Sequence, residues 1–517
     1  SVDMPLMEAG LDSLGAVEFR SRLSRQLGDV KLPETLVFDF PTLRQIELHV
    51  GTLVMAADHK SEDPQHAIGN DGCMRDLLLA LIHTAAQRPA ATPTVTPLRD
   101  NNSFIHAVGC KMGGGICGIK RSRHAGTTAH DAVCSAPTTR WDASDDLDVR
   151  ALYGAFMQQI ELFDQTSFSI PPAEADIMDP HQRLALEEGY AALRASGLRR
   201  GSLMNSVTGV FGGLWPSDYM TVLPKRGALG RGPFAVAATG PAMLVGRLSY
   251  TLGMQGPSVA FDTACSASLS AFQAAMYAQG HQDSEAALVL GVNVMCDSNT
   301  SQLFAAANMT SPRGKSHTFD ARADGYARGE ACCCAVLLQE SEELWKLRCE
   351  AGAVRQDGKS ASLTAPNGTA QQALIRAALS SAGRSSRGAF VLEAHGTGTS
   401  LGDPIEARAM CSVREEPGLM TVMGCKASVA HTEPTAGVAG LLQLVMVMLE
   451  DMASPNAQLR VMNLHVSAAL EGSPSLPVQV NAKEAAGVDR IGGVSSFGLN
   501  GTIVHAIIST PVGSVDS

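Results

Sequence analysis

The sequence lacks several features that would place it in whole classes of protein. Its formal net charge is −11 over 517 residues, and its basic residues form no stripe, which argues against nucleic acid as a partner. Its longest apolar runs, such as 440–449, fall well below the roughly 20 residues that a membrane span needs. No secretory signal opens the chain, so we expect a cytoplasmic location. Hydrophobic residues make up 45% of the chain and charged residues 18%, which indicates a globular protein of more than one unit.

The twelve cysteines do not have the arrangement of a disulfide framework or a metal site. They are scattered along a long chain and include the consecutive run 332–334. The segment 110–134 also contains histidines, but it lacks the paired short-gap ligands of structural zinc sites. We therefore expect reduced, mostly buried thiols and no bound metal.

The chain divides into three segments by pattern. Residues 1–52 alternate short helical patterns with turns and predict a small helical unit. Residues 53–102 are polar and rich in proline and threonine, which is typical of a linker. Residues 103–512 alternate glycine-bounded apolar strands with helical patterns, which predicts a layered α/β domain. Two α/β halves that meet near residues 340–360 would fit this pattern.

Cys265 is the candidate nucleophile. The apolar run 258–261 predicts a buried strand, and the small residues that follow predict a helix that ends at Gly280. Cys265 would then lie at the helix N-terminus, where unpaired N–H groups and the helix dipole favour a thiolate. The alternative is an ordinary buried cysteine that acts as a small hydrophobic residue.

Two later segments each place a histidine at a junction between elements. His395 follows a strand in EAHGTGTSLGDPIEA, and His431 precedes a helix in KASVAHTEPTAGVAG. A cysteine and two histidines can share a reaction, in which one group attacks a carbonyl and others stabilise an enolate oxygen. The turn VSSFGLNG could add a backbone amide at Phe497 or Gly498 as an oxyanion donor, or it could be only a tight turn. Together these residues suit acyl-thioester chemistry.

These motifs resemble the β-ketoacyl synthase (ketosynthase) domain of modular polyketide synthases. The resemblance covers about residues 103–512 and includes DTACSAS, HTE, SSFG, RWD, IMDPHQRLALE, GRLSYTLGMQGPS and FDARADGYARGE in the family's order. It implies a thiolase-like αβαβα fold of two related halves. It also implies a homodimer, an acyltransferase activity and acyl carrier protein domains as partners.

Residues 3–23, DMPLMEAGLDSLGAVEFRSRL, resemble the attachment site of an acyl carrier protein. The resemblance makes Ser13 the serine that bears 4′-phosphopantetheine, although a serine there could also be a simple helix N-cap. Residues 1–52 would form a partial carrier bundle, because the family's first helix is missing. The phosphopantetheine arm, on Ser13 or on a partner carrier, is then the only cofactor needed.

The resemblance implies a role for each motif residue. Cys265 would take the acyl chain from one carrier, and a malonyl group on another carrier would be decarboxylated and attack it. His395 and His431 would stabilise the enolate. The amides of Cys265 and Phe497 would hold the oxyanion.

Four further residues receive supporting roles by the same resemblance. Lys426 and Glu433 would orient the two histidines. Thr397 and Thr399 would bind the pantetheine arm. The reaction would be decarboxylative Claisen condensation, which elongates a polyketide or fatty-acid type chain.

Three departures from the family pattern qualify this expectation. Ala430 stands where the family has glycine, Ile503 stands where it has asparagine, and residues 110–133 replace an aromatic and leucine-rich helix with glycine and basic residues. A non-elongating synthase that only transfers acyl chains therefore remains open. So does a non-catalytic partner that shapes a chain-length tunnel, although Cys265 argues against it. An unrelated cysteine hydrolase fits poorly, because neither histidine has an apparent carboxylate partner.

Overall fold

The protein is described here from a computed structural model whose chain separates into two compact units, residues 1–96 and 97–517. The structure describes these residues: 23, 24, 27, 32, 36, 40, 42–58, 103–142, 147–227, 232–339, 347–360, 362–384, 390–413, 420–450, 452–470, 481–482 and 491–510. Ser13 and nearly all of the expected linker lie outside them. The expected domain boundaries at 52 and 102 stay predictions.

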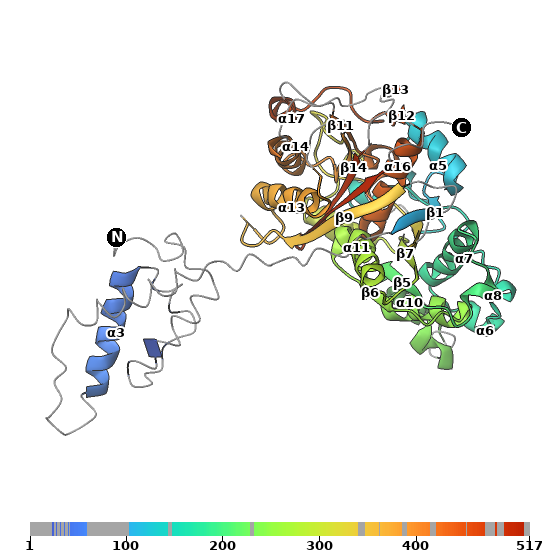
Figure 1. Ribbon diagram of the computed structural model, residues 1–517, viewed down its shortest axis with the longest axis horizontal. Coiled ribbons are helices and arrows are strands. Elements are labelled where there is room, and N and C mark those ends of the chain that lie inside the picture. Colours follow the sequence, from blue (N-terminus) through green and yellow to red (C-terminus); the bar gives the residue numbers. More distant parts are fainter. Residues whose placement is uncertain are drawn as a thin grey trace. The chain divides into compact units, whose positions relative to one another are not determined.

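The first unit contains one described helix, α3 (Leu43–Asp58), coloured blue in Figure 1. Its buried residues Leu43, Ile46 and Val50 recur at helical spacing and form one apolar side. Leu23 and Leu36 are also fully buried, which agrees with a small helical unit.

The second unit is built around a mixed β-sheet that runs in the order β11-β10-β14-β15-β9-β1-β8-β7-β5-β6, with β2 paired to β1. The first half contributes β1 (Phe104–Met112), β5 (Thr208–Gly213), β6 (Ser258–Phe261), β7 (Ala286–Asn293) and β8 (Ala331–Leu338). The second half contributes β9 (Leu347–Gln356), β10 (Phe390–Glu393), β11 (Met420–Met423), β14 (Ile491–Phe497) and β15 (Thr502–Ser509).

The two halves have the same topology. Numbered within each half, the five strands lie in the order 3-2-4-5-1 in both. The second strand pairs in parallel with the third and the fourth, whereas the fifth pairs antiparallel with its two neighbours, in both halves. The break between Leu338 and Leu347 falls where the sequence placed it, and the expected pair of related halves is confirmed.

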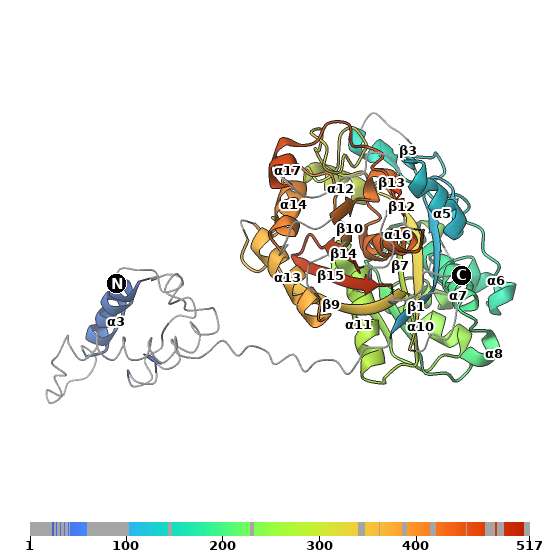
Figure 2. The ribbon, with the colours of Figure 1, turned by 45° about the horizontal axis from the view of Figure 1, so that its top comes forward.

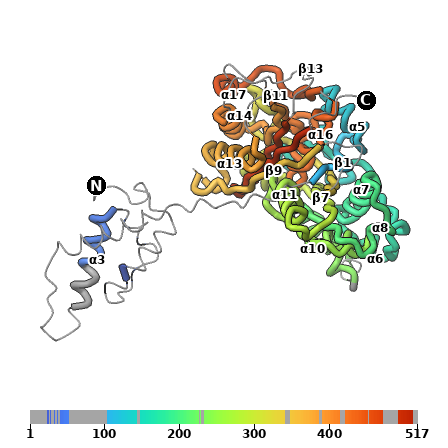
Figure 3. Tube along the Cα trace, viewed as in Figure 1, coloured from blue at the N-terminus to red at the C-terminus, as the bar shows by residue number. Residues whose placement is uncertain are grey.

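Helices cover the strands in layers, as Figures 1 and 2 show. The equivalent helices α11 (Ala267–Gly280) and α16 (Ala436–Glu450) follow the third strand of each half and pack against each other in the middle. In the first half α7 (Pro180–Ala195) packs on β1 and β8, and α10 (Pro241–Leu252) packs on β5 and β6. In the second half α13 (Gly368–Ser381) packs on β9 and β15, beside α14 (Gly402–Ser412), which also contacts α17 (Leu464–Ala469). The tube in Figure 3 follows the same path.

Short elements complete the unit. They are β2 (Ile116–Cys117), α5 (Gly118–Thr127), β3 (Cys134–Ser135), β4 (Tyr153–Gly154), α6 (Pro172–Ala175), α8 (Arg200–Leu203), α9 (Tyr219–Val222), α12 (Asn299–Ala306), α15 (Lys426–Val429), β12 (Met452–Ala453) and β13 (Asn481–Ala482).

The helix α16 is apolar on every side, as expected of a helix in a protein core. By length and composition alone, residues 433–450 could cross a bilayer. This span is longer than the 440–449 run considered from sequence. However, 89% of that window is buried inside the unit. Burial between the two halves therefore accounts for its composition.

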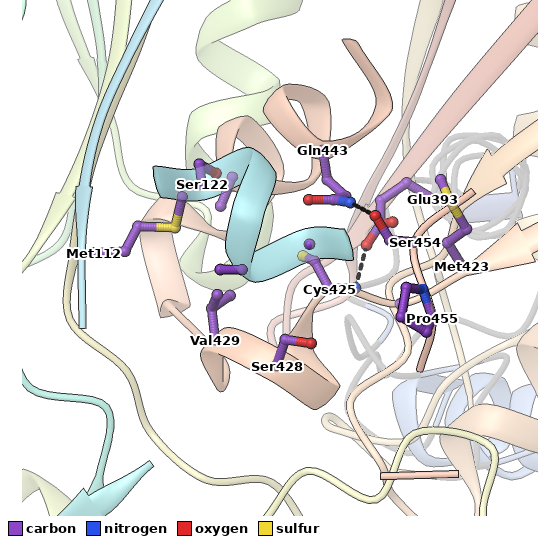
Figure 4. A pocket seen from close by; sticks show the side chains of 14 residues that line it. Met112, Ser122, Glu393, Met423, Cys425, Ser428, Val429, Gln443, Ser454 and Pro455 are labelled. Carbon is purple, nitrogen blue, oxygen red and sulfur yellow. Dashed lines mark hydrogen bonds between the residues drawn. The ribbon is translucent and has the colours of Figure 1, made fainter. Parts of the chain in front are cut away.

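The divergent segment after β1 forms the helix α5, which presents Lys120, Arg121 and Arg123 to solvent. Its inward residues are small, and they include Ser122. Figure 4 shows the cavity of about 20 Å³ that these small side chains leave beside Glu393. That volume is about the size of one water molecule. The segment thus keeps a helix but packs it with small side chains.

Candidate active site

Cys265 lies where the sequence predicts it, between β6 and α11. Residues 264–266 form a short 3-10 turn that leads into α11, and the Cys265 side chain is buried. The approach of α11 to the sheet is close, because a Cβ on Gly213 would stand 2.1 Å from the backbone of Ser268. The carbonyl of Cys265 accepts a hydrogen bond of 2.8 Å from Ser496 Oγ on β14. Both halves therefore fix the position of Cys265.

The resting charge of Cys265 differs from the sequence prediction. The pKa of its thiol is raised to about 12, mainly by burial and secondly by the charge of Glu433. Lys426 and nearby backbone amides lower the pKa but do not outweigh burial. The predicted resting thiolate is therefore wrong: Cys265 is a thiol at neutral pH, because the helix N-terminus does not compensate for the loss of water.

His431 contacts Cys265 directly. Its Nε2 lies 3.0 Å from Cys265 Sγ, and its Nδ1 accepts the backbone N–H of Glu433 at 3.4 Å. Because Nδ1 is an acceptor, we assign the ring proton to Nε2, which faces the sulfur. The edge of the Tyr326 ring packs against the imidazole, with 4.9 Å between the centroids.

His395 reaches the same point from the end of β10. Its ring is nearly perpendicular to that of His431, with 5.6 Å between the centroids. The backbone N–H of Phe497 donates to His395 Nδ1 at 3.3 Å, which again leaves the proton on Nε2. Each of the two neutral imidazoles therefore has its N–H donor at Nε2, and both rings lie near the thiol.

Burial keeps both imidazoles neutral. It lowers the pKa of His395 and of His431 well below the ordinary value, and the charge of Lys426 lowers both further. Lys426 is itself buried, at the start of α15. Its influence on the histidines is thus electrostatic, since no hydrogen bond joins it to either ring among the described residues.

Glu433 acts differently from the expectation. Its carboxylate accepts hydrogen bonds from Arg328, at 2.5 and 2.9 Å, and from Asn293 Nδ2 at 2.8 Å. Only its backbone amide touches His431. Arg328 was missed in the sequence, although the motif FDARADGYARGE contains it, because 105 positions separate it from Glu433.

Two carboxylates that the sequence did not single out hold the loop after His395. Glu406 accepts the backbone N–H groups of His395 and Gly396 at 2.7 and 2.9 Å. Asp403 accepts those of Phe319 and Gly398 at 2.7 and 3.1 Å. Burial raises the pKa of Asp403 to about 7. The loop is fixed by buried acids at the start of α14.

The glycines Gly396 and Gly398 of this loop pack closely against other parts of the protein. A Cβ on Gly398 would stand 2.6 Å from the backbone nitrogen of His317, and φ is +78° there. Gly396 has φ +45° and packs against Thr318. Only glycine adopts such angles without strain, so these residues shape the loop that carries His395.

A cavity of about 350 Å³ joins these groups. Cys265, His395, His431 and Phe497 line it, together with Thr397 and Thr399. The two threonine hydroxyls lie 3.3 Å apart, and Thr399 also accepts the N–H of Gly402. A narrow cavity with hydroxyl groups beside a buried thiol fits a pantetheine thioester.

The expected oxyanion amide lies in the turn between β14 and β15. The N–H of Gly498 donates to Thr502 O at 2.8 Å and closes the turn, so it is not available for a ligand. The N–H of Phe497 faces His395 and lines the cavity. The N–H of Phe497 also has an acceptor, His395 Nδ1, so both amides are engaged in this structure and the oxyanion role of Phe497 stays a prediction.

The two departures near the site have different structural settings. Ala430 has φ +63° and ψ −176°, a region that is essentially restricted to glycine. Ile503 is fully buried in β15, opposite Phe497 in the strand pairing. Ala430 therefore strains the backbone next to His431, whereas Ile503 packs as an ordinary strand residue.

Within the described residues, no group of three or more His, Cys, Asp or Glu side chains is arranged to hold a metal ion. The cysteines of the segment 110–134 also differ in burial, because Cys110 is buried and Cys117 and Cys134 are exposed.

Comparison with known families matches most of the chain. The N-terminal domain of the β-ketoacyl synthase family matches residues 105–343, and its C-terminal domain matches residues 348–460. The phosphopantetheine attachment site family matches residues 1–50.

Curated relatives are far longer than this chain. Polyketide synthase GfsA of Streptomyces halstedii is 34% identical over 540 residues, which cover 99% of this chain and 7% of that protein. Mycoketide-CoA synthase of Mycobacterium tuberculosis is 33% identical over 527 residues, which cover 98% of this chain and 12% of that protein. The chain thus spans a small part of the relatives it matches.

Solved structures show the same fold. The ketosynthase from module 6 of the bacillaene synthase of Bacillus subtilis 168 has a TM-score of 0.72 at 28% identity, covering 79% of this chain and 72% of that one. The oxazolomycin ketosynthase domain OzmH KS7 of Streptomyces albus JA3453 has a TM-score of 0.73 at 26% identity, covering 80% and 75%. The chain therefore belongs to the β-ketoacyl synthase family, as a polyketide synthase ketosynthase preceded by a phosphopantetheine-carrier segment.

Proposed function

We propose that this ketosynthase elongates an acyl chain by decarboxylative condensation, as an acyltransferase with Cys265 as its nucleophile. The observation that carries the proposal is the meeting of the thiol with two neutral imidazoles in one cavity, with His431 Nε2 at 3.0 Å from Cys265 Sγ. In such an arrangement the thiol can accept an acyl group, and the two N–H donors can stabilise an enolate.

The first step transfers the acyl group. Cys265 sulfur attacks the carbonyl of an acyl-pantetheine thioester, the bond from that carbonyl to the pantetheine sulfur breaks, and the thiol proton ends on the departing sulfur. The backbone amide of Cys265 would hold the oxyanion of the tetrahedral intermediate, joined by that of Phe497 if it turns from His395 Nδ1 to the oxyanion. The buried thiol is uncharged at rest, so its proton has to leave as the sulfur attacks.

The second step extends the chain. The carboxylate of a malonyl thioester leaves as carbon dioxide, and its bonding electrons form an enolate whose oxygen accepts from Nε2 of His395 and His431. The enolate carbon then attacks the acyl carbonyl on Cys265 and displaces the sulfur, which takes a proton from solvent. Burial keeps both imidazoles neutral, the charge of Lys426 adds to that effect, and the amide of Glu433 fixes the tautomer of His431.

Acyl and malonyl groups would arrive on phosphopantetheine arms of carrier domains. Thr397 and Thr399 would bind the arm, because their hydroxyls line the cavity that leads to Cys265. Ser13 would carry such an arm on the preceding carrier segment. The cytoplasmic location expected from the sequence stays a prediction.

A homodimer would use the free edge of the sheet. The edge strand β6 pairs on only one side among the described strands, and Val259 on it is 39% exposed. Exposed aromatic residues flank it, Tyr250 on α10 and Tyr277 on α11. An exposed edge strand is a template for pairing with a second copy. Sedimentation of the whole chain tests this, and a monomer at micromolar concentration would contradict it.

The condensation is tested by two readouts on one sample. The protein is incubated with an acyl-pantetheine thioester and a malonyl carrier, and mass analysis follows both acylation of Cys265 and release of carbon dioxide. We expect both in the wild type and neither acylation nor product in Cys265→Ala. Acylation that persists in Cys265→Ala would exclude Cys265 as the nucleophile.

A second candidate function is acyl transfer without elongation. The observation that favours it is the strained backbone of Ala430 beside His431. In the experiment above, acylation of Cys265 without carbon dioxide release would select this alternative.

A further inference from the structure

The hydroxyl of Tyr326 is a hydrogen-bonding group of the catalytic cavity to which the reaction described above gives no role. Tyr326 lines this cavity with Cys265 and His431, and only 5% of its surface is exposed. Among the described residues none bonds to the hydroxyl, yet its oxygen is not one of the enclosed side-chain atoms that lack a partner. The exposed part of Tyr326 therefore includes this oxygen, which is open to the cavity that the residue lines.

The backbone and a ring contact fix Tyr326 relative to His431. The N–H of Tyr326 donates to Met309 O at 3.2 Å, and its carbonyl accepts the N–H of Ser311 at 2.9 Å. The next carbonyl, that of Ala327, accepts the N–H of His431 at 2.8 Å. The two rings are nearly perpendicular, with 4.9 Å between their centroids. The hydroxyl is thus held on the same side of the cavity as the imidazole that touches the nucleophile.

The cavity offers a negatively charged ligand neutral donors and no cation. Burial raises the pKa of Tyr326 well above its ordinary value, and the charge of Glu433 raises it further, so the phenol keeps its proton. The described residues that line the cavity include no lysine and no arginine, whereas Asp357 and Glu406 are acids. A carboxylate that enters this space would therefore have to bind through neutral donors.

A malonyl extender carries such a carboxylate, two carbon–carbon bonds from its thioester carbonyl carbon. In the proposed condensation the thioester oxygen accepts from Nε2 of His395 and His431, which places the carboxylate close to these rings. Tyr326 is the phenol that packs on His431. The hydroxyl and the carboxylate therefore lie in the same part of the cavity.

We propose that Tyr326 is a specificity residue whose hydroxyl donates a hydrogen bond to the carboxylate of the malonyl extender and orients it beside His431. When the carbon–carbon bond to the carboxylate breaks, its electrons form the enolate and neutral carbon dioxide leaves, while Tyr326 keeps its proton. A neutral donor suits this role, because it holds the carboxylate without the strong charge stabilisation that would oppose decarboxylation. The inference rests on the proposed function, since it requires a malonyl extender in the cavity.

Binding of two inert ligands by the full chain tests the hydrogen bond without any reaction. The ligands are pantetheine analogues in which N–H replaces the sulfur, one with a malonyl group and one with an acetyl group. By calorimetry, Tyr326→Phe should weaken binding of the malonyl amide about tenfold and leave the acetyl amide unchanged. An unchanged affinity for the malonyl amide, or an equal loss for both ligands, would overturn the proposal.

Two control variants separate Tyr326 from other hydroxyl and amide donors. Gln371→Leu removes an amide donor that also lines the cavity, and Tyr250→Phe removes a hydroxyl on α10 that is 89% exposed. Both should bind the two amides as the wild type does. A loss for the malonyl amide in Gln371→Leu but not in Tyr326→Phe would assign the carboxylate to α13 instead. Tyr326→Phe should keep the melting temperature, because no hydrogen bond within the protein is lost.

Kinetics with a malonyl carrier give a readout that a structural role of Tyr326 would not produce. Tyr326→Phe should raise KM about tenfold without lowering the saturated rate of carbon dioxide release, because the lost bond belongs to the bound extender and not to the transition state. Acylation of Cys265 should stay at the wild-type rate. A lower saturated rate with unchanged KM would contradict the proposal. Failure of the wild type to release carbon dioxide would sink the proposed function, while the affinities for the two amides would still decide the role of Tyr326.

Discussion

The two halves of the synthase unit share one topology but supply different chemistry at equivalent positions. In the first half the connection from the third strand to its helix carries Cys265, whereas in the second half the same connection carries His431. His395 follows the second strand of the second half. Because α11 and α16 are equivalent and in contact, the fold brings a nucleophile and a hydrogen-bond donor together at one end. We infer that the first half would hold the acyl group, whereas in the second half His431 would serve both steps and His395 only the extender.

A buried ion pair between Arg328 and Glu433 joins the two halves, and breaking it gives the largest expected effect. Glu433→Ala leaves Arg328 buried without its partner and should lower the free energy of unfolding by about 3–5 kcal/mol. Urea denaturation followed by circular dichroism measures the loss. The double variant Arg328→Met with Glu433→Leu should lose clearly less, and an equal loss would contradict the ion-pair explanation.

His431 belongs to both steps because it touches the sulfur. His431→Ala should slow carbon dioxide release by about 10²–10³-fold, the usual cost of losing one preorganised donor to an oxyanion. Acylation of Cys265 should also slow, since His431 Nε2 lies 3.0 Å from Sγ. The exposed His465→Ala serves as the control, and a His431→Ala protein with unchanged acylation would separate the residue from the nucleophile.

Glu393 tests how burial changes the pKa of a carboxyl group in the second half. Its pKa is raised to about 7 by burial, from 4.5, so the folded state binds the proton more tightly than the unfolded state. The contribution of Glu393 to stability is therefore present below pH 4.5 and is lost as the pH rises to about 7, by at most about 1.4 kcal/mol per pH unit.

The variant Glu393→Gln should remove this part of the pH dependence. Thermal denaturation at a series of pH values gives the difference from wild type, with exposed Glu161→Gln as the control for losing one charge. A difference that does not change between pH 4.5 and 7 would show that the carboxyl is ionised throughout.

The smallest effect is expected at Ala430. Ala430→Gly relieves a backbone strain of about 1–3 kcal/mol, which the greater freedom of glycine in the unfolded chain and the lost methyl partly offset. We expect a net gain of about 1 kcal/mol in the free energy of unfolding. Ala427→Gly, in the helical turn just before it, should instead lose about 1 kcal/mol. A loss in both variants would mean that Ala430 is not strained.

Much of this site could be predicted from the sequence, because a junction between a strand and a helix has a recognisable local pattern. The strand before Cys265, the helix after it and the junction positions of His395 and His431 all follow from local pattern. The predicted burial of that strand is wrong, because β6 is at the edge of the sheet and Val259 is 39% exposed. The partners of Glu433 do not, since Arg328 and Asn293 come from distant segments that only the sheet order brings together.

The charge states of the buried groups could not be predicted from local sequence pattern. A helix N-terminus is visible in sequence and favours a thiolate at Cys265, but burial depends on the whole fold and dominates its pKa. The roles of Asp403 and Glu406 were hidden for a similar reason. Each accepts backbone N–H groups, and those groups leave no trace in residue identity.

The division of labour between the halves is tested most directly by His395→Ala, assayed for acyl occupancy and carbon dioxide release on the same sample. His395 is not in hydrogen-bond contact with Cys265 among the described interactions, yet it lines the same cavity. We predict that acyl occupancy of Cys265 stays at the wild-type level while carbon dioxide release falls at least about 100-fold. Loss of both in proportion would contradict the account, because His395 would then be needed for acyl transfer as well.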